Sequence, residues 1–335
     1  MLIIVRTDNH MTTAYYYSLI LSAAKKAGYD SISVDSIKDL KRIKHNKKRD
    51  IVINGTIKDG AYLLMHGYKR VFTWFQGIVE ERKMQHCSAI KVFTMTLLER
   101  ILCKKSEFCI FVSNAEKEHF ETKYKTSWND NYYILPCFNE THIYEESFRK
   151  PNTKTVFSYT GGFGVWQCLD QTLELYKMIE SKCSDVEFDF FTNNPEKGKA
   201  LLTKHGIQNC KCEYVTPEKL NIALKDVSFG FVLREDDPVN NVATPTKFST
   251  YLANGVIPIY TAFVKDFSEM MKSRKFRIEL PSLDLSLAAE QIIAFMQQPR
   301  DENELKEEYK SIFEDYYCEK KHLENLSAKL GYLKK

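Results

Sequence analysis

Two basic residues in the second half of the chain stand where their side chains could hold an anion. Arg234 follows the apolar run 229–233, and three acidic residues come directly after it. An arginine at the carboxyl end of a strand can bind a diphosphate through its planar set of donors. It could equally form an ion pair with the acidic residues on the surface, so the position of Arg234 alone does not establish an anion-binding site.

Lys247 has a sequence context that favours anion binding. Thr244 and Pro245 precede it and are typical of the start of a helix. A lysine in the first turn of a helix opposes the helix dipole, so its presence there indicates a role other than helix stability. An anion bound jointly by backbone amides and Lys247 fits that role.

A glycine-rich loop lies further towards the N-terminus, at residues 160–167. Gly161, Gly162 and Gly164 follow a predicted strand and precede a predicted helix. Glycines let the backbone approach a phosphate closely, and the start of a helix supplies free N–H groups. The spacing does not match the G-x-G-x-x-G fingerprint, so a plain tight turn remains open and an NAD-dependent oxidoreductase is disfavoured.

Short apolar runs alternate with helical segments along the whole chain, which predicts an α/β fold. Strands are expected at 2–5, 32–34, 50–54, 71–75, 108–112 and 133–135, and again at 155–159, 187–191, 211–214, 229–233 and 257–260. The charged, proline-containing segment 145–153 separates the two sets, and helices are expected at 287–296 and 302–330. This alternation predicts two Rossmann-like domains with parallel sheets, whose ligands bind at the carboxyl ends of the strands.

Composition and charge limit the classes of function. The 335 residues favour two domains at roughly 150 residues each, and the net charge is +4. Seven lysines and arginines crowd residues 38–49, which indicates either a solvated loop or a patch attracted to anionic lipid headgroups. No aromatic residue interleaves these cations to stack on bases, so nucleic acid is not an expected partner.

The cysteines and apolar stretches indicate the cellular setting. The nine cysteines form no C-x-x-C pair, which favours a reducing compartment and therefore the cytoplasm. No apolar stretch reaches the roughly 20 residues that span a bilayer. Any membrane contact is therefore expected to be peripheral, at the inner face of the cell membrane.

Four segments together resemble the GT-B glycosyltransferases, in particular the retaining enzymes of family 4 that synthesise surface polysaccharides. Residues 230–259, G-F-V-L-R-E-D-D-P-V-N-N-V-A-T-P-T-K-F-S-T-Y-L-A-N-G-V-I-P-I, are similar to that family's stretch ending in P-x-K-x-x-E-Y-x-A-x-G-x-P-V-I. Residues 159–167 resemble its strand and Gly-Gly loop, and 110–115 and 134–139 resemble segments that close its first domain. The resemblance covers nearly the whole chain in the right order.

The resemblance implies a domain organisation. Two Rossmann-like domains would face each other across a cleft, with the acceptor bound by residues 1–148 and the nucleotide-sugar donor by residues 149–311. A C-terminal helix at about 312–335 would pack back on the first domain.

The resemblance also implies roles for individual residues. Arg234 and Lys247 would be catalytic, because they would bind the diphosphate and stabilise it as the leaving group. The other donor-binding residues would surround the phosphates, the base and the ribose: Gly161, Gly162, Gly164, Gln167, Thr216, Thr246 and Thr250.

Two of these positions depart from the family pattern. Gln167 stands where a lysine is often found, and Thr250 stands where a glutamate usually holds the donor ribose. The family's E-x7-E pair is absent, because Val242 and Thr250 occupy its places. A threonine can donate one hydrogen bond to a ribose hydroxyl, but it cannot accept hydrogen bonds from two hydroxyls at once as a carboxylate does.

The acceptor is expected at loops that follow strands of the first domain. Asp8, Asn9 and His10 follow the first strand, and Trp74, Gln76 and Glu80 lie in or after the strand at 71–75. Trp74 could stack on a sugar or simply belong to the core. His10 could act as an acid or base or merely face water.

These observations predict a hexosyltransferase. It would move a sugar from a UDP- or GDP-type donor to a glycan or lipid-linked acceptor, with retention of configuration and without a cofactor. No D-x-D sequence occurs to hold a divalent ion, which agrees with metal-independent transfer. Gln167 and Thr250 motivate one alternative, a catalytically weak relative that binds a glycan or a protein.

Overall fold

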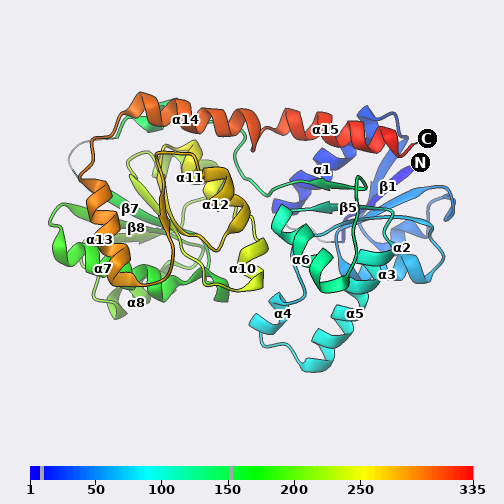
Figure 1. The fold of residues 1–335 in the computed structure, drawn as a ribbon, viewed down its shortest axis with the longest axis horizontal. Helices are drawn as coiled ribbons and strands as arrows, with labels where there is room; N and C mark the ends of the chain where they lie inside the picture. The colour runs from blue at the N-terminus through cyan, green and yellow to red at the C-terminus, as the bar shows by residue number, and fades with distance from the viewer. Residues whose placement is uncertain (8–10, 151–153, 335) are drawn as a thin grey trace. The chain divides into compact units, whose positions relative to one another are not determined.

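The computed structural model describes residues 1–7, 11–150 and 154–334. By its internal contacts the chain divides into two compact units (Figure 1). Unit 1 comprises Met1–Pro136 and Glu319–Lys335, and unit 2 comprises Cys137–Cys318. The boundaries drawn from the sequence differ from this division in the placement of residues 137–148 and 312–318.

Unit 1 is built on a six-stranded parallel sheet with strand order β2-β1-β3-β4-β5-β6. Its strands are β1 (Leu2–Val5), β2 (Ser31–Val34), β3 (Ile51–Asn54), β4 (Arg70–Trp74), β5 (Phe108–Phe111) and β6 (Tyr132–Ile134). The central strands are apolar runs that are buried throughout, as expected for a sheet covered by helices on both faces.

The described residues of unit 1 form these helices beside the sheet: α1 (Met11–Lys26), α2 (Ile37–Leu40), α3 (Ile57–Met65), α4 (Glu81–Met84), α5 (Ala89–Lys105), α6 (Asn114–Tyr124) and α15 (Glu319–Tyr332). Thr56, Ser88 and Ser113 each cap a helix by accepting a hydrogen bond from a backbone N–H of its first turn. The C-terminal helix α15 packs against α1, and the Tyr29 hydroxyl donates to the Leu330 carbonyl at 3.0 Å.

A buried ionic network joins α5 and α6 to the loop after β4. Glu99 of α5 is fully buried, accepts from the backbone N–H of Val79 at 2.8 Å and pairs with Lys123 at 2.7 Å. Lys123 also pairs with Glu80 at 2.8 Å. Burial alone would raise the pKa of Glu80, but hydrogen bonds from His119 and Lys123 outweigh it and lower the pKa to about 2.

Unit 2 repeats the architecture with a second six-stranded parallel sheet, in the order β12-β11-β10-β7-β8-β9. Its strands are β7 (Thr155–Thr160), β8 (Val186–Phe191), β9 (Cys210–Glu213), β10 (Phe229–Val232), β11 (Ile257–Thr261) and β12 (Ile278–Leu280). The α/β class with two parallel sheets, expected from the sequence, is confirmed.

The helices of unit 2 include both long covering helices and short turns at the carboxyl ends of strands. They are η1 (Glu145–Phe148), η2 (Val165–Gln167), α7 (Leu169–Lys182), α8 (Pro195–Lys204), η3 (Pro217–Lys219), α9 (Leu220–Ala223), α10 (Pro238–Val242), α11 (Lys247–Ala253), α12 (Lys265–Met271), α13 (Leu285–Met296) and α14 (Glu302–Asp315).

The C-terminal region differs from its sequence-based prediction. The single helix expected over 302–330 is divided into α14 and α15 by residues 316–318. No proline or glycine marks this break in the sequence. Tyr317 is buried there against Phe138 and Phe313, so tertiary packing ends the helix.

The core of unit 2 is aromatic and tightly packed around α11. Tyr251 of α11 is fully buried beneath the sheet, and its hydroxyl accepts from the backbone N–H of Thr160 at 3.0 Å. Gly230 of β10 makes room for this ring, because a Cβ at that position would lie 2.5 Å from a ring carbon of Tyr251. Gly230 therefore allows α11 to pack close to the sheet.

Among the residues described, no helix is both long enough and apolar enough to cross a membrane.

We predict that Gly230→Ala lowers the free energy of unfolding by about 1 to 3 kcal/mol, because the added methyl group overpacks the contact with Tyr251. Urea denaturation measures the change. Gly162→Ala is the matched control, since a Cβ at Gly162 meets nothing within 4 Å. Equal stability of the two variants would contradict the packing described here.

Candidate functional site

Arg234 lies at the carboxyl end of β10, and its backbone is fixed by the neighbouring strand. Its N–H donates to the Thr261 hydroxyl at 3.0 Å, and that hydroxyl donates to the Arg234 carbonyl at 2.7 Å. The residue is only 2% exposed. One guanidinium nitrogen, Nη1, donates to the Leu233 carbonyl at 2.9 Å, whereas Nε has no partner in the part of the chain that the structure describes.

Lys247 is the first residue of α11 and is 9% exposed. Its Nζ donates to Oε1 of Gln167 at 2.9 Å and lies 4.1 Å from the centroid of the Tyr159 ring. The amide oxygen and the face of the aromatic ring both favour a cation, but neither carries a full negative charge.

The acidic residues that follow Arg234 have other partners. Glu235 accepts from the side chain of Gln171 at 3.0 Å, and Asp236 accepts from Asn241 at 2.9 Å. Asp237 caps α10 by accepting from the N–H of Val239. In residues 154–334, therefore, no carboxylate forms an ion pair with Arg234 or Lys247, and the surface pairing considered from the sequence does not occur.

The electrostatics of this pair follow from burial. Burial, followed by the charge of Arg234, lowers the pKa of Lys247 well below its ordinary value. Burial also lowers the pKa of Arg234. Two desolvated cations with no opposing charge are costly for the protein alone, and a bound anion would offset that cost.

The glycine loop packs against Lys247. Gly161 adopts φ +141°, a conformation that favours glycine, and its N–H donates to the Phe191 carbonyl at 2.9 Å. A Cβ on Gly161 would lie 3.3 Å from Nζ of Lys247. The Tyr159 hydroxyl holds the loop by donating to the Gly162 carbonyl at 2.7 Å. The structure thus brings the loop, Gln167 and Lys247 together.

The remaining residues predicted for the donor have different surroundings. Gly164 lies against its own neighbour Trp166, whose ring a Cβ would approach to 2.9 Å. Thr246 stands at the N-cap of α11. Thr250 is buried, and its hydroxyl donates within the helix to the Thr246 carbonyl at 3.4 Å. Thr216 lies between β9 and η3. In the sheet, β8 separates β9 from β7, the strand that the glycine loop follows.

Three residues near the cations were not predicted from the sequence. Tyr159 lies under Lys247, and Thr261 fixes the backbone of Arg234. Cys168 is buried with φ +47°, and burial raises the pKa of its thiol to about 11 although both cations oppose this shift. Tyr159 ends the predicted strand 155–159 directly before the glycine loop, and this position could have indicated that it belongs to the site.

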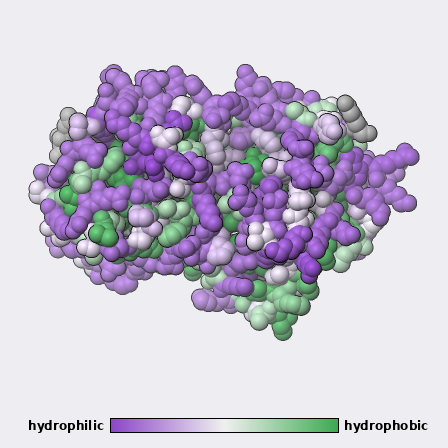
Figure 2. All heavy atoms as spheres, viewed as in Figure 1, coloured by the Kyte–Doolittle hydropathy of each residue, from purple (hydrophilic) through white to green (hydrophobic). Residues whose placement is uncertain are grey.

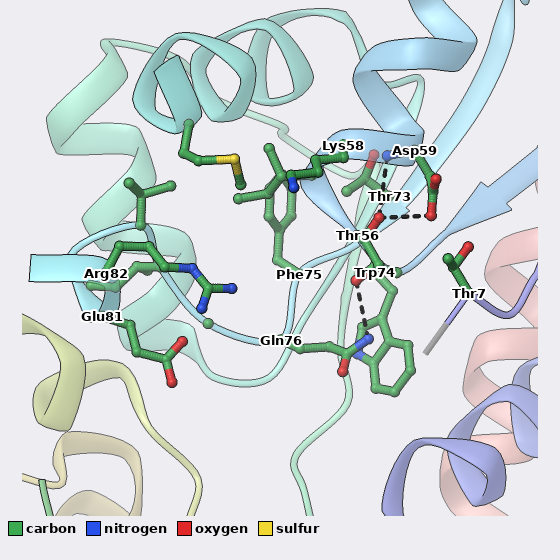
Figure 3. Close-up of a pocket in the computed structure, with 16 residues that line it drawn as sticks. Thr7, Thr56, Lys58, Asp59, Thr73, Trp74, Phe75, Gln76, Glu81 and Arg82 are labelled. Carbon is green, nitrogen blue, oxygen red and sulfur yellow. Dashed lines mark hydrogen bonds between the residues drawn. The ribbon is translucent and has the colours of Figure 1, made fainter. Parts of the chain in front are cut away.

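Unit 1 has a pocket of about 480 Å³ at the carboxyl ends of β3 and β4 (Figure 3). Thr56, Lys58, Gln76 and Arg82 contribute polar groups to its wall. Gln76 is held by a hydrogen bond from its Nε2 to the Gly55 carbonyl at 3.2 Å, and Thr56 by its exchange of hydrogen bonds with Asp59. The pocket therefore presents cationic groups from Lys58 and Arg82, the amide of Gln76 and the carboxylates of Asp59 and Glu81.

The predicted acceptor residues divide between this pocket and other places. Trp74 and Gln76 line the pocket, although Trp74 is buried and packs against Tyr16 and Tyr17 as a core residue. Glu80 is engaged with Lys123 and His119, and its neighbour Glu81 lines the pocket in its place. The candidates Asp8, Asn9 and His10 fall outside the described residues.

Within the described residues, no group of three or more His, Cys, Asp and Glu side chains could hold a metal ion. Transfer without a metal nevertheless remains a prediction.

Comparison with known proteins gives no match by sequence. No family model matches this chain, and no curated protein matches it.

Solved structures are similar in fold. The galactosyltransferase WaaB of the lipopolysaccharide outer core has a TM-score of 0.66 at 11% identity, with 97% of this chain and 99% of that chain covered. Anabaena HepE, solved with UDP-glucose, has a TM-score of 0.66 at 9% identity, with 99% of each chain covered. S. aureus TarM, solved in a complex that contains UDP, has a TM-score of 0.58 at 13% identity. Here 86% of this chain is covered, and it spans only 57% of that TarM chain.

These similarities, together with two parallel six-stranded sheets in separate units, show that the chain has the GT-B fold of nucleotide-sugar glycosyltransferases.

Proposed function

We propose that the chain is a glycosyltransferase that transfers a sugar from a nucleoside diphosphate sugar to a saccharide or lipid-linked acceptor. The observation that carries this proposal is the burial of Arg234 and Lys247 without an opposing carboxylate in the described part of unit 2, with Lys247 next to the loop of Gly161. In this proposal they bind the diphosphate.

The chemistry of sugar transfer requires such a pair. As the bond from the sugar to the phosphate breaks, negative charge develops on the departing diphosphate and positive character on the sugar ring. Fixed cations aimed at the phosphate contribute on the order of 3 to 4 kcal/mol each in a site that excludes water. Arg234 and Lys247 therefore act as the catalytic residues, because they stabilise the leaving group.

Gln167 has a positioning role in this proposal. Its amide oxygen accepts from Nζ of Lys247 at 2.9 Å, which directs the ammonium towards the glycine loop. A lysine at position 167 would instead add a third cation close to the other two. Gln167 therefore holds Lys247 without opposing its charge.

A uridine nucleotide is the donor that the comparisons favour. TarM was solved with UDP and HepE with UDP-glucose, and both share the fold of this chain. A GDP-type donor, a hexose as the transferred sugar, retention of configuration and membership of family 4 rest on the sequence resemblance. Action in the cytoplasm rests on the cysteine content.

The acceptor belongs, in this proposal, to the pocket at the carboxyl ends of β3 and β4. Gln76 and Lys58 would donate to hydroxyl groups of the acceptor, and Arg82 suits an acceptor with an anionic group. Phe75 and Met95 also line this wall and contribute apolar groups to it. This arrangement matches a saccharide, which presents both hydroxyl groups and apolar ring faces.

The hydrogen bond of Thr250 favours a second candidate function, that of a weak or inactive glycosyltransferase relative that binds a glycan or a protein. Its hydroxyl donates to the Thr246 carbonyl of its own helix, so the hydrogen bond that it could offer to a ribose is already in use. Assays of hydrolysis and transfer with UDP-, GDP- and ADP-sugars separate the two candidates. Turnover supports the enzyme, whereas glycan binding without turnover supports the relative.

We predict that Lys247→Met and Arg234→Met abolish stabilisation by UDP without destabilising the free protein. Each substitution removes a buried charge that lacks a counter-charge, so the melting temperature without nucleotide should stay equal or rise. UDP at 100 times its dissociation constant should add about 2.7 kcal/mol to the wild-type free energy of unfolding, and little to that of either variant.

Thermal denaturation with and without UDP measures both effects. Lys182→Met, which removes an exposed lysine at the end of α7, is the control and should respond to UDP like the wild type. Undiminished stabilisation of both site variants by UDP would contradict the proposed diphosphate site.

We also predict that UDP binding takes up a proton at and above the lowered pKa of Lys247. Burial and Arg234 lower the pKa of Lys247 in the free protein, so its ammonium loses the proton at a lower pH than an ordinary lysine. A bound diphosphate favours the charged form, and affinity should therefore fall as the pH rises through the pKa of Lys247.

Calorimetry in two buffers of different ionisation enthalpy measures this uptake. The pH is kept above the phosphate pKa of about 6 and below the pH at which uracil loses its N3 proton, so that the nucleotide itself does not titrate. Equal proton uptake by the Lys247→Met variant would assign the effect to another group and refute this prediction.

A further inference from the structure

The outer face of α5 is apolar. Four of its side chains are exposed to solvent: Ile90 by 81%, Phe93 by 65%, Leu97 by 43% and Ile101 by 38%. At 100° per residue these four positions fall within an arc of about 80°, so they form a single stripe along the helix. Figure 2 shows hydrophobic atoms gathered at the lower end of this part of the molecule, where Figure 1 draws α5.

Basic residues flank this stripe on both sides. On the helical wheel Lys91 and Lys105 lie on one side of it and Arg100 lies on the other, while Lys104 lies within its arc at the C-terminal end of the helix. All four are exposed. The only acidic residue in the α5 sequence, Glu99, lies on the opposite face and is fully buried. The exposed charge of α5 is thus entirely positive.

The inner face fixes the helix in this orientation. Met95, Leu102 and Cys103 are buried, and Glu99 binds Val79 and Lys123 as described above. Rotation of α5 to hide the apolar stripe would break these buried ionic contacts, which is strongly unfavourable. The stripe is therefore held facing solvent in the structure.

We propose that this outer face of α5 binds the surface of an anionic lipid bilayer. The four apolar side chains would enter the boundary between headgroups and acyl chains, while the flanking cations contact anionic headgroups. A second copy of the chain is a poorer occupant, because a symmetric contact would bring the cations of both copies together.

The position of α5 connects this surface to the proposed acceptor pocket. Met95, on the inner face of α5, lines the pocket at the ends of β3 and β4. A helix is about 10 to 12 Å across, so the pocket lies about one helix diameter from the bilayer surface. If the proposed function holds, this arrangement favours an acceptor that is anchored in the lipid.

The basic segment 38–49 is placed differently. It begins in α2 (Ile37–Leu40), which follows the carboxyl end of β2, and its last residues, 47–49, directly precede the amino end of β3. Lys47 lies over the Tyr68 ring and donates to the His66 carbonyl. Contact through Lys47 and Lys48, at the amino ends of the strands, would not bring the pocket towards the bilayer.

The test is co-sedimentation of the full chain with vesicles of phosphatidylcholine alone and of phosphatidylcholine with phosphatidylglycerol. The wild type should bind the anionic vesicles. Phe93→Ser/Leu97→Ser should weaken that binding about tenfold or more, because both side chains lose their apolar contact with lipid. Arg100→Gln/Lys104→Gln should weaken it by about tenfold to thirtyfold and reduce its dependence on salt.

Two control variants separate this surface from others. Ile222→Ser/Leu287→Ser removes equally exposed apolar side chains from unit 2, and Lys44→Gln/Lys48→Gln removes cations from segment 38–49. Both controls should bind vesicles like the wild type. Since all of these side chains are exposed, every variant should fold, and circular dichroism checks that it does.

Three outcomes would overturn the inference: no binding of the wild type to anionic vesicles, unchanged binding of the Phe93→Ser/Leu97→Ser variant, or a loss of self-association in that variant without any vesicle binding. UDP binding, measured on the same proteins, separates this inference from the proposed function. Vesicle binding without UDP binding leaves the inference standing, whereas UDP binding without vesicle binding refutes the inference alone.

Discussion

The burial of two basic side chains without an opposing charge is the constraint on which the proposed chemistry depends. Burial lowers the pKa of both Arg234 and Lys247, and the charge of Arg234 lowers the pKa of Lys247 further. A protein selected for stability alone would replace one of them or supply a carboxylate. Here the surrounding polar groups are neutral: the amide of Gln167, the carbonyl of Leu233 and the ring of Tyr159. The site is thus prepared for an anion that the chain itself does not provide.

The parallel sheet explains why these groups meet. Arg234 follows β10, the glycine loop follows β7, and these two strands are neighbours in the sheet. Lys247 comes from α11, which connects β10 to β11 and packs against β10 through Tyr251 and Gly230. The glycine loop therefore meets residues that come about 70 or more positions later in the chain, at the carboxyl ends of the strands. The same logic in unit 1 places a pocket at the carboxyl ends of β3 and β4.

The sequence predicts the scaffold better than the partners of its side chains. The strands were predictable because they are short apolar runs between polar loops, and the glycine loop and Arg234 were identifiable by their places at strand ends. The contact of Gln167 with Lys247 joins residues 80 positions apart, so no local pattern shows it. Glu80 and Glu81 are adjacent, yet only packing decides that one binds Lys123 and the other lines the pocket. The helix α5 has apolar residues on both faces, so its periodicity could not indicate which face remains exposed.

The most direct test of the central claim is a crystal structure of the chain with UDP. The account predicts that Nζ of Lys247 and the guanidinium of Arg234 lie within hydrogen-bonding distance, about 2.7 to 3.2 Å, of phosphate oxygens beside Gly161. A nucleotide whose phosphates lie away from both cations would contradict it.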